Sequence, residues 1–194
     1  MSAAADARPS RPRRYDFAPP AGFANRDAGL AVSALDEASL RLFDMFEDLP
    51  QESLHFVPPE GTNSIAMLAL HLAFGEAYWI ARGTGTAVPD ELAAALRPGG
   101  QDGSGELPNS RRTPAELIEL CRRVRETFTK PLVAPLADID IERPSDKLPL
   151  TVRGVLYHQL WHWTYHSGQV GLLRRLSGPR MKWVFAQKLT GGPK

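Results

Sequence analysis

Several features that mark other protein classes are scarce in this chain of 194 residues. Cys121 is its single cysteine, which excludes a disulfide within the chain and makes a reducing compartment the natural expectation. No apolar run is long enough to cross a bilayer, since the longest apolar-rich stretch, residues 65–80, contains His71 and Glu76. The first residues lack the apolar core of a secretory signal. We therefore expect a cytoplasmic protein with no membrane partner.

An excess of charge of one sign is also missing. The chain has 23 Lys and Arg residues against 22 Asp and Glu residues, so its formal net charge is +1. A domain dedicated to nucleic acid is usually strongly basic, and we expect no such partner here. Hydrophobic residues make up 43% of the chain and charged residues 23%, which is ordinary for a soluble globular domain. A small molecule is the expected substrate.

Alternating, strand-type hydrophobicity is absent, whereas apolar residues recur at three- and four-residue steps in four long segments. These segments predict helices over about residues 27–49, 64–82, 114–130 and 151–176. A shorter helix is expected over residues 90–96. Four long amphipathic helices without a sheet predict an all-α fold, a four-helix bundle.

Capping residues and prolines give the expected helix ends. Asp27 is expected to cap the first helix, and Asn63 or Ser64 the second. Thr113 is a strong candidate for the third cap, because a proline follows it directly and a glutamate follows three residues later. Pro131 should end or kink that helix, since proline lacks the backbone N–H that a helix interior needs.

Three segments differ from the helices in composition. Residues 1–25 are rich in Ala, Pro and Arg and are expected to form a disordered or loosely docked tail. Residues 26–178 form the predicted bundle, and residues 179–194 a C-terminal extension with room for one short helix. The Gly-rich stretch 97–108 is interpreted as a loop, which could be a lid, an oligomer contact or simply disordered.

Three of the five histidines, His158, His162 and His166, lie four residues apart on the last expected helix, so neighbouring ones share a helix face. Positions eight apart are separated by about 12 Å along a helix axis. That is too far for one ion, because metal–nitrogen bonds are about 2.0–2.1 Å long. One ion can therefore use His158 with His162, or His162 with His166.

The polar seam of this helix distinguishes the two pairs. At about 100° per residue, one line along the helix contains Val155, His162, His166 and Leu173, with Gln159 and Gln169 beside it. His158 lies about 60° away from that line. Burying histidines and glutamines is costly unless they are hydrogen-bonded or bind a metal. The seam favours His162 with His166 as ligands, and makes His158, Gln159 and Gln169 candidates for the pocket or for orienting the imidazoles.

A third ligand would have to come from another helix. Catalytic zinc sites use three protein ligands and keep one position open. His71 is the candidate, because it lies on the inner stripe of the second helix. Gly75, one turn later, removes a side chain beside it and could make room for substrate or for a close helix. The alternative is a bundle without metal, in which waters and glutamines satisfy the histidines.

Two segments resemble a known family. Residues 61–80, GTNSIAMLALHLAFGEAYWI, resemble the second-helix motif of the DinB/YfiT-like proteins, in which a polar cap and an apolar stretch precede a ligand histidine. Residues 156–176, LYHQLWHWTYHSGQVGLLRRL, resemble their last core helix, with its His-x3-His-x-Gly-Gln hallmark. The resemblance implies an up-and-down four-helix bundle, often a homodimer. It also implies a zinc or nickel site formed by His71, His162 and His166.

The resemblance implies metal-dependent chemistry as well. Characterised relatives include transferases and isomerases that use bacillithiol or mycothiol, and others are described only as metal-dependent hydrolases. We therefore expect a metal-dependent enzyme, in the first instance an S-transferase with a low-molecular-weight thiol as co-substrate. The alternatives are a metal-dependent hydrolase and a non-catalytic stress protein that binds metal or a small molecule. The histidine seam carries no obvious general-base carboxylate, which favours the thiol route or a non-enzyme. No catalytic residue is assigned from the sequence.

Overall fold

The computed structural model describes residues 8–12, 14–61, 63–97, 110–144 and 149–182. Its elements, in chain order, are β1 (Arg8–Pro9), α1 (Arg26–Phe46), α2 (Gln51–Leu54), α3 (Ile65–Thr84), α4 (Asp90–Leu96), α5 (Pro114–Val124), the π-helical turn η2 (Arg125–Thr129), α6 (Lys130–Val133), α7 (Val152–Leu176) and β2 (Met181–Lys182). The expected short helix over residues 90–96 is confirmed as α4.

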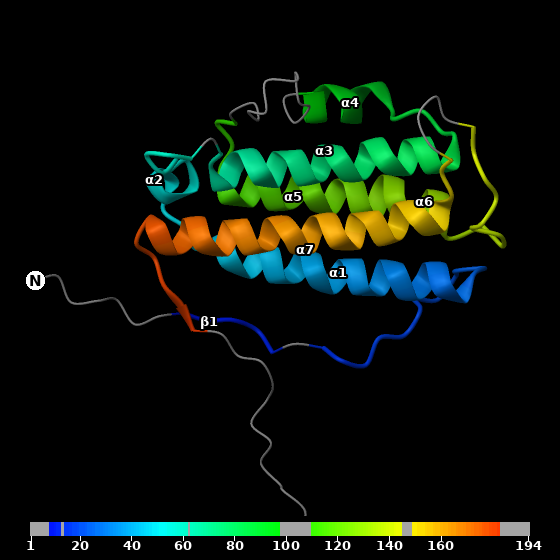
Figure 1. Ribbon diagram of the computed structural model, residues 1–194, viewed down its shortest axis with the longest axis horizontal. Coiled ribbons are helices and arrows are strands. Elements are labelled where there is room, and N and C mark those ends of the chain that lie inside the picture. The colour runs from blue at the N-terminus through cyan, green and yellow to red at the C-terminus, as the bar shows by residue number, and fades with distance from the viewer. Residues whose placement is uncertain (1–7, 13, 62, 98–109, 145–148, 183–194) are drawn as a thin grey trace, which may run out of the picture.

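The four long helical segments run side by side (Figure 1). α7 packs against both α1 and α3, and α3 also packs against α5 and η2. Apolar side chains from all four segments meet between them in one core, among them Leu35, Phe46, Leu68, Leu117 and Trp163. The predicted all-α four-helix bundle is confirmed, with α3 and α7 as neighbours. None of the helices in the described ranges has the length and apolar character needed to cross a membrane.

The helix caps agree with the sequence at two of three starts. Ser64 caps α3, and Thr113 forms a reciprocal capping box with Glu116 at the start of α5. The prediction of Asp27 as the first cap is wrong by two residues. The cap is Asn25, whose side-chain oxygen accepts hydrogen bonds from two backbone N–H groups of the first turn. Asp27 lies inside that turn, where a carboxylate is favoured by the helix dipole.

Pro131 does not end the third long segment, because helical residues continue to Val133. The preceding five residues form η2, whose hydrogen bonds reach one residue further than those of an α-helix. This wider turn moves the earlier carbonyl away from the proline ring, which would clash with it in a regular α-helix. Pro131 also lies at the start of α6, where its missing N–H costs little.

The described part of the N-terminal segment lies against the bundle. β1 pairs in parallel with β2, and the backbone N–H of Ser10 donates to the carbonyl of Lys182 at 2.9 Å. Arg11 donates to the Asp44 carboxylate at 2.6 Å, and Arg41 donates to the Arg11 carbonyl at 2.7 Å. The Gly-rich stretch after Arg97 and the expected short helix beyond residue 182 fall outside the described residues.

Candidate metal centre

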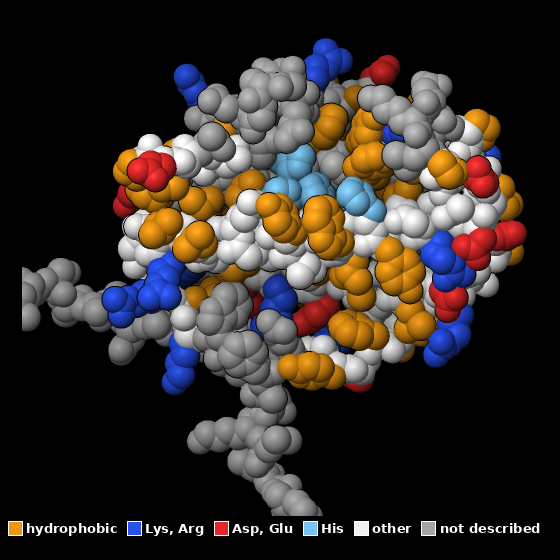
Figure 2. Space-filling view, in the orientation of Figure 1, with side chains coloured by type: hydrophobic (Ala, Val, Ile, Leu, Met, Phe, Trp, Pro, Cys, Tyr) orange, Lys and Arg blue, Asp and Glu red, His pale blue; other side chains and the backbone are white. Residues whose placement is uncertain are grey.

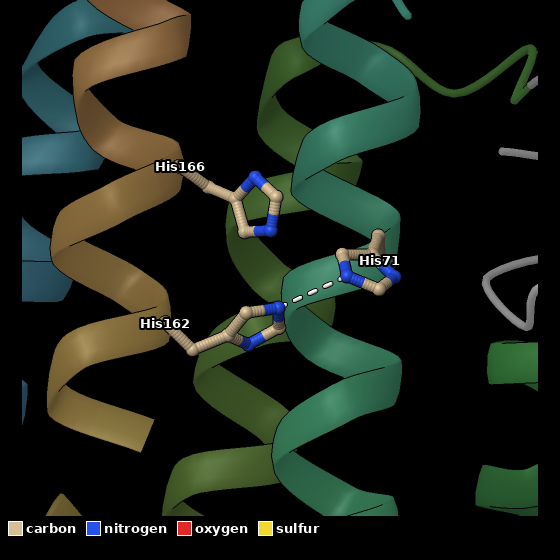
Figure 3. Close-up of side chains that lie close together, drawn as sticks. All are labelled: His71, His162 and His166. Atoms are coloured by element: carbon tan, nitrogen blue, oxygen red, sulfur yellow. Dashed lines mark hydrogen bonds between the residues drawn. The ribbon is translucent and has the colours of Figure 1, made fainter. Parts of the chain in front are cut away.

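Three histidines from two helices, α3 and α7, point toward one another between those helices (Figure 3). His71 comes from α3, and His162 and His166 come from successive turns of α7. Each offers one ring nitrogen, and these three atoms lie within 4.8 Å of one another. The Nε2 atoms of His71 and His162 are 2.9 Å apart. Such a group of nitrogen atoms could hold one metal ion.

Gly75 allows α3 and α7 to approach closely at this point. A Cβ atom at this position would lie 2.9 Å from Cε1 and 3.3 Å from Nδ1 of His162. Real Cβ atoms essentially never make the shorter of these contacts. The space that the sequence suggested beside His71 is therefore filled by the imidazole of His162, which rests on the backbone of α3.

Burial favours the neutral form of His162 and His166. His162 is only 7% exposed, and burial, together with repulsion from His166 and His71, lowers its pKa to about 3. Burial also lowers the pKa of His166. A neutral imidazole has one nitrogen lone pair available, whereas a protonated one has none. These two imidazoles therefore offer nitrogen lone pairs that could bind a metal ion at neutral pH.

The two glutamines of the seam have different partners. Gln169 Oε1 lies 2.6 Å from Nδ1 of His166. Because an amide oxygen can only accept, this nitrogen carries the proton, and the lone pair lies on Nε2 of His166. Gln159 is fully buried, and its Nε2 donates to the carbonyl of Gly75 at 3.5 Å. Gln169 thus orients an imidazole, whereas Gln159 joins α7 to the backbone of α3.

His158 lies outside the three-histidine group. Its ring is nearly parallel to that of His162, with the ring centroids 5.8 Å apart, and it contacts Trp79 from α3 at 5.1 Å. Burial lowers the pKa of His158 too. His158 lines a cavity beside the cluster, one helical turn from His162.

The sequence profile of the DinB superfamily matches residues 34–170, a range that includes all three histidines. The chain belongs to the DinB superfamily. Two relatives from Bacillus subtilis (strain 168) are each 27% identical to it. The uncharacterised protein YkkA aligns over 84% of this chain and 90% of its own length, and Protein DinB over 73% and 80%.

A solved structure shows the same fold. The crystal structure of a conserved protein from Enterococcus faecalis superposes with a TM-score of 0.58 and is 18% identical. The match covers 76% of this chain and 95% of that one. At this level of identity the comparison supports the bundle architecture alone.

A buried ion pair lies behind the three-histidine group of this DinB superfamily chain. This pair was not predicted from the sequence. The guanidinium of Arg125 donates to both carboxylate oxygens of Glu76, at 2.6 and 2.7 Å, and Thr129 adds a third hydrogen bond. Burial alone would lower the pKa of Arg125, but the Glu76 and Asp36 carboxylates raise it above its ordinary value. Glu76 is thus held by η2 and points away from the histidines.

Cys121 lies near this ion pair and takes no part in the three-histidine group. Its side chain is 2% exposed, and its thiol donates to the carbonyl of Ala69 at 3.7 Å. Burial, and then the nearby Glu76 carboxylate, raise the pKa of Cys121 to about 12. The residue therefore stays a protonated core thiol, as its position on an apolar helical stripe suggests.

Proposed function

We propose that this protein binds one divalent metal ion, zinc or nickel, through His71, His162 and His166. We further propose that it uses the ion to transfer the sulfur of a low-molecular-weight thiol to an electrophilic carbon. The main support for this proposal is the composition of the ligand group among the described residues. The group consists of three imidazoles and contains no carboxylate. Imidazole suits both zinc and nickel.

The residues fit a three-histidine ion in three respects. Ligand atoms around a tetrahedral ion with bonds of about 2.0–2.1 Å lie roughly 3.3 Å apart, and the His71 and His162 nitrogens are already 2.9 Å apart. Gly75 leaves room for the ring of His162 where any other side chain would displace it. Gln169 turns the free lone pair of His166 away from itself, as hydrogen-bond partners of metal-ligating histidines commonly do.

A divalent ion held by neutral imidazoles would supply a positive charge that lowers the pKa of a thiol or a water beside it. In the transfer, the sulfur forms a bond to the electrophilic carbon, the leaving group departs with its bonding pair, and the thiol proton passes to solvent. Hydrolysis by water usually needs a positioned base as well. Glu76, the buried carboxylate of α3, is engaged by Arg125. This arrangement favours the thiol over water as the nucleophile.

Elemental analysis after incubation with zinc or nickel tests the metal site. We expect about one equivalent of metal per chain in the unmodified protein and a large loss in His166→Ala. The matched control is His158→Ala, which removes an imidazole one turn beyond His162 and should keep most of the metal. Less than about a tenth of an equivalent in the unmodified protein, or greater loss in His158→Ala than in His166→Ala, would refute the site.

Thiol consumption tests the reaction. The metal-loaded protein is incubated with bacillithiol, mycothiol or glutathione and a reactive alkyl or aryl halide, and the loss of free thiol is followed against the His166→Ala variant. We expect turnover with at least one thiol in the loaded protein and none in the variant. Ester hydrolysis without thiol consumption would instead assign the site to a hydrolase. Metal binding without either activity would leave a binding protein.

A further inference from the structure

Five ring side chains lie in an unbroken series beside the three-histidine group. This aromatic rim consists of Tyr78, Trp79, His158, Trp161 and Tyr165, and successive ring centroids are 5.3, 5.1, 5.8 and 5.3 Å apart. At its end, the ring of Tyr165 contacts that of His166 at 5.1 Å. The rim therefore joins α3 to α7 and reaches a proposed metal ligand directly.

The rim is open to solvent although it is aromatic. Tyr78 is 41% exposed, Tyr165 is 52% exposed and Trp161 is 59% exposed. Figure 2 shows histidine side chains reaching the surface on this face, with hydrophobic side chains beside them. Exposed apolar side chains that are grouped, rather than scattered singly, mark binding surfaces. Aromatic rings gain most when a flat apolar group stacks on them.

A cavity opens where the rim crosses from α3 to α7. Its volume is about 490 Å³, within the range of small-molecule sites. Trp79 and His158 form the wall nearest the histidines, and the buried side chains of Leu150 and Val155 form the apolar floor. The lining is completed by Glu142, Pro149, Thr151 and Gly154. Since His158 borders both this cavity and His162, a molecule bound here lies directly beside the metal centre.

The charges of the described cavity lining disfavour an anion as its occupant. Glu142 is the charged side chain in its described lining, and it is negative. Arg153 precedes the lining residue Gly154, but its guanidinium is held by Asp140 at 2.6 Å and by Asp27 at 3.0 Å. No cation of the described lining is left to pair with a carboxylate. Bacillithiol and glutathione carry carboxylates and fit poorly here.

We propose that the cavity and the aromatic rim bind the uncharged, planar body of the electrophilic substrate. The ring of that substrate lies against Trp79 and His158, with Trp161 beyond His158 on the rim, and its reacting carbon reaches the three-histidine site past His158. This inference rests on the proposed function for the role of its ligand as electrophile. The binding itself needs neither the metal nor the thiol.

Equilibrium binding to the full-length, metal-free protein tests the subsite. Saturation-transfer NMR compares 4-nitrotoluene with 4-methylbenzoate, which have nearly the same shape but differ by one negative charge. Two variants disturb the subsite without emptying the core. Trp161→Ala removes an exposed ring of the rim, and Gly154→Leu places a side chain over the cavity at an exposed helical position. Tyr157→Ala is the matched control, because Tyr157 is 57% exposed on the same helix and makes no ring contact within the described residues.

We expect 4-nitrotoluene to bind, and its Kd to rise about five- to tenfold in Trp161→Ala and in Gly154→Leu. The Kd should change less than about twofold in Tyr157→Ala, and 4-methylbenzoate should bind at least about tenfold more weakly than 4-nitrotoluene. Equal binding of both compounds would overturn the proposal. An equal rise in the Kd of 4-nitrotoluene in Tyr157→Ala and in Trp161→Ala would also overturn it. That result would show that the compound binds nonspecifically to any exposed ring of α7.

The same variants separate this inference from the proposed function. If 4-nitrotoluene binds as expected while no thiol is consumed, the subsite stands and the transfer reaction fails. If thiol transfer to an aryl halide proceeds but Trp161→Ala and Gly154→Leu leave its KM unchanged, the transfer stands and the subsite is wrong. Zinc content should be unaltered in both variants, because the Trp161 side chain makes no ring contact with the three imidazoles and Gly154 lies two helical turns before His162.

Discussion

At the scale of single residues, the site depends as much on a missing side chain as on the three imidazoles. The histidines supply the nitrogens, but Gly75 decides where one of them can lie. Gln169 decides which nitrogen of His166 is free. A glycine and a glutamine are common residues in helices of every kind, yet here each fixes the position or the proton of a specific ring.

Replacing Gly75 with alanine should separate metal affinity from stability. Alanine favours a helix by about 1 kcal/mol over glycine, so α3 itself should not be weakened. The new methyl group would press on the ring of His162 and move its nitrogen away from His71. We expect zinc affinity, measured by competition with a chromophoric chelator, to fall about tenfold or more.

Gly168→Ala provides the control for this prediction. Gly168 is also helical, on α7, but a Cβ there would meet nothing within 4 Å. We expect unchanged zinc affinity and a free energy of unfolding that rises by up to about 1 kcal/mol. Equal zinc affinity in the Gly75 and Gly168 variants would contradict the role given to Gly75.

At the scale of elements, the π-helical turn η2 carries the ion pair that lies behind the site. Arg125 reaches Glu76 on α3 and Asp36 on α1, and its guanidinium lies 5.4 Å from the ring of Trp163 on α7. One side chain therefore contacts all three of the other long helices. The histidine-bearing helices α3 and α7 are held to a common partner on the side opposite to the three-histidine group.

Replacing Arg125 with methionine should leave the Glu76 carboxylate buried, with the Thr129 hydroxyl as its remaining partner among the described residues. Removing one member of a buried ion pair typically costs about 3–5 kcal/mol. We expect a loss of that size in the free energy of unfolding, measured with urea. The double variant Arg125→Met with Glu76→Gln should recover a large part of it, because the uncompensated charge is gone. A double variant no more stable than Arg125→Met alone would show that the charge is not the cause.

At the scale of the whole molecule, the buried histidines make the metal-free fold sensitive to acid. The pKa of His162 is about 3 in the folded protein and about 6.5 in an unfolded chain. Between these values the unfolded state binds more protons than the folded state, so the free energy of unfolding falls as the pH falls. His158 and His166 act in the same direction, because burial lowers the pKa of each.

We expect the metal-free protein to lose up to about 1.4 kcal/mol per pH unit for His162 alone as the pH is lowered from about 6.5. Carboxylates with ordinary pKa values of about 3.9–4.3 begin to protonate below about pH 5.5, so urea unfolding between pH 6.5 and 5.5 isolates the histidines. His162→Leu should flatten this dependence, since leucine suits the buried seam and does not titrate. The same slope in the variant and the unmodified protein would show that His162 is not the residue responsible.

The bundle could be predicted because each helix buries one face, so its apolar residues recur at three- and four-residue steps in the sequence. The caps at Ser64 and Thr113 were readable for a similar reason, since capping uses residues only a few positions apart. The first cap was misplaced because Asp27 and Asn25 are both good capping residues two positions apart. Local chemistry alone does not choose between two such neighbours.

Contacts that join distant parts of the chain were harder to predict. The sequence offered a pair of histidines on one helix and a candidate on another, but not the packing of Gly75 on His162, which depends on how closely two helices approach. The Arg125–Glu76 pair was missed because its members lie 49 positions apart. One signal was present: Arg125 follows Cys121 by one helical turn, which places a charge on an apolar stripe.

The nitrogens of His71 and His162 meet across 91 positions of sequence. A metal ion bound by both histidines would link these two positions and close a loop of nearly half the chain. Because the unfolded chain does not hold these residues together, the ion would bind the folded state and stabilise it by the free energy of binding. With one cysteine, the chain has no disulfide of its own to do this. A chelator would then act on this protein as a reducing agent acts on a disulfide-bonded one.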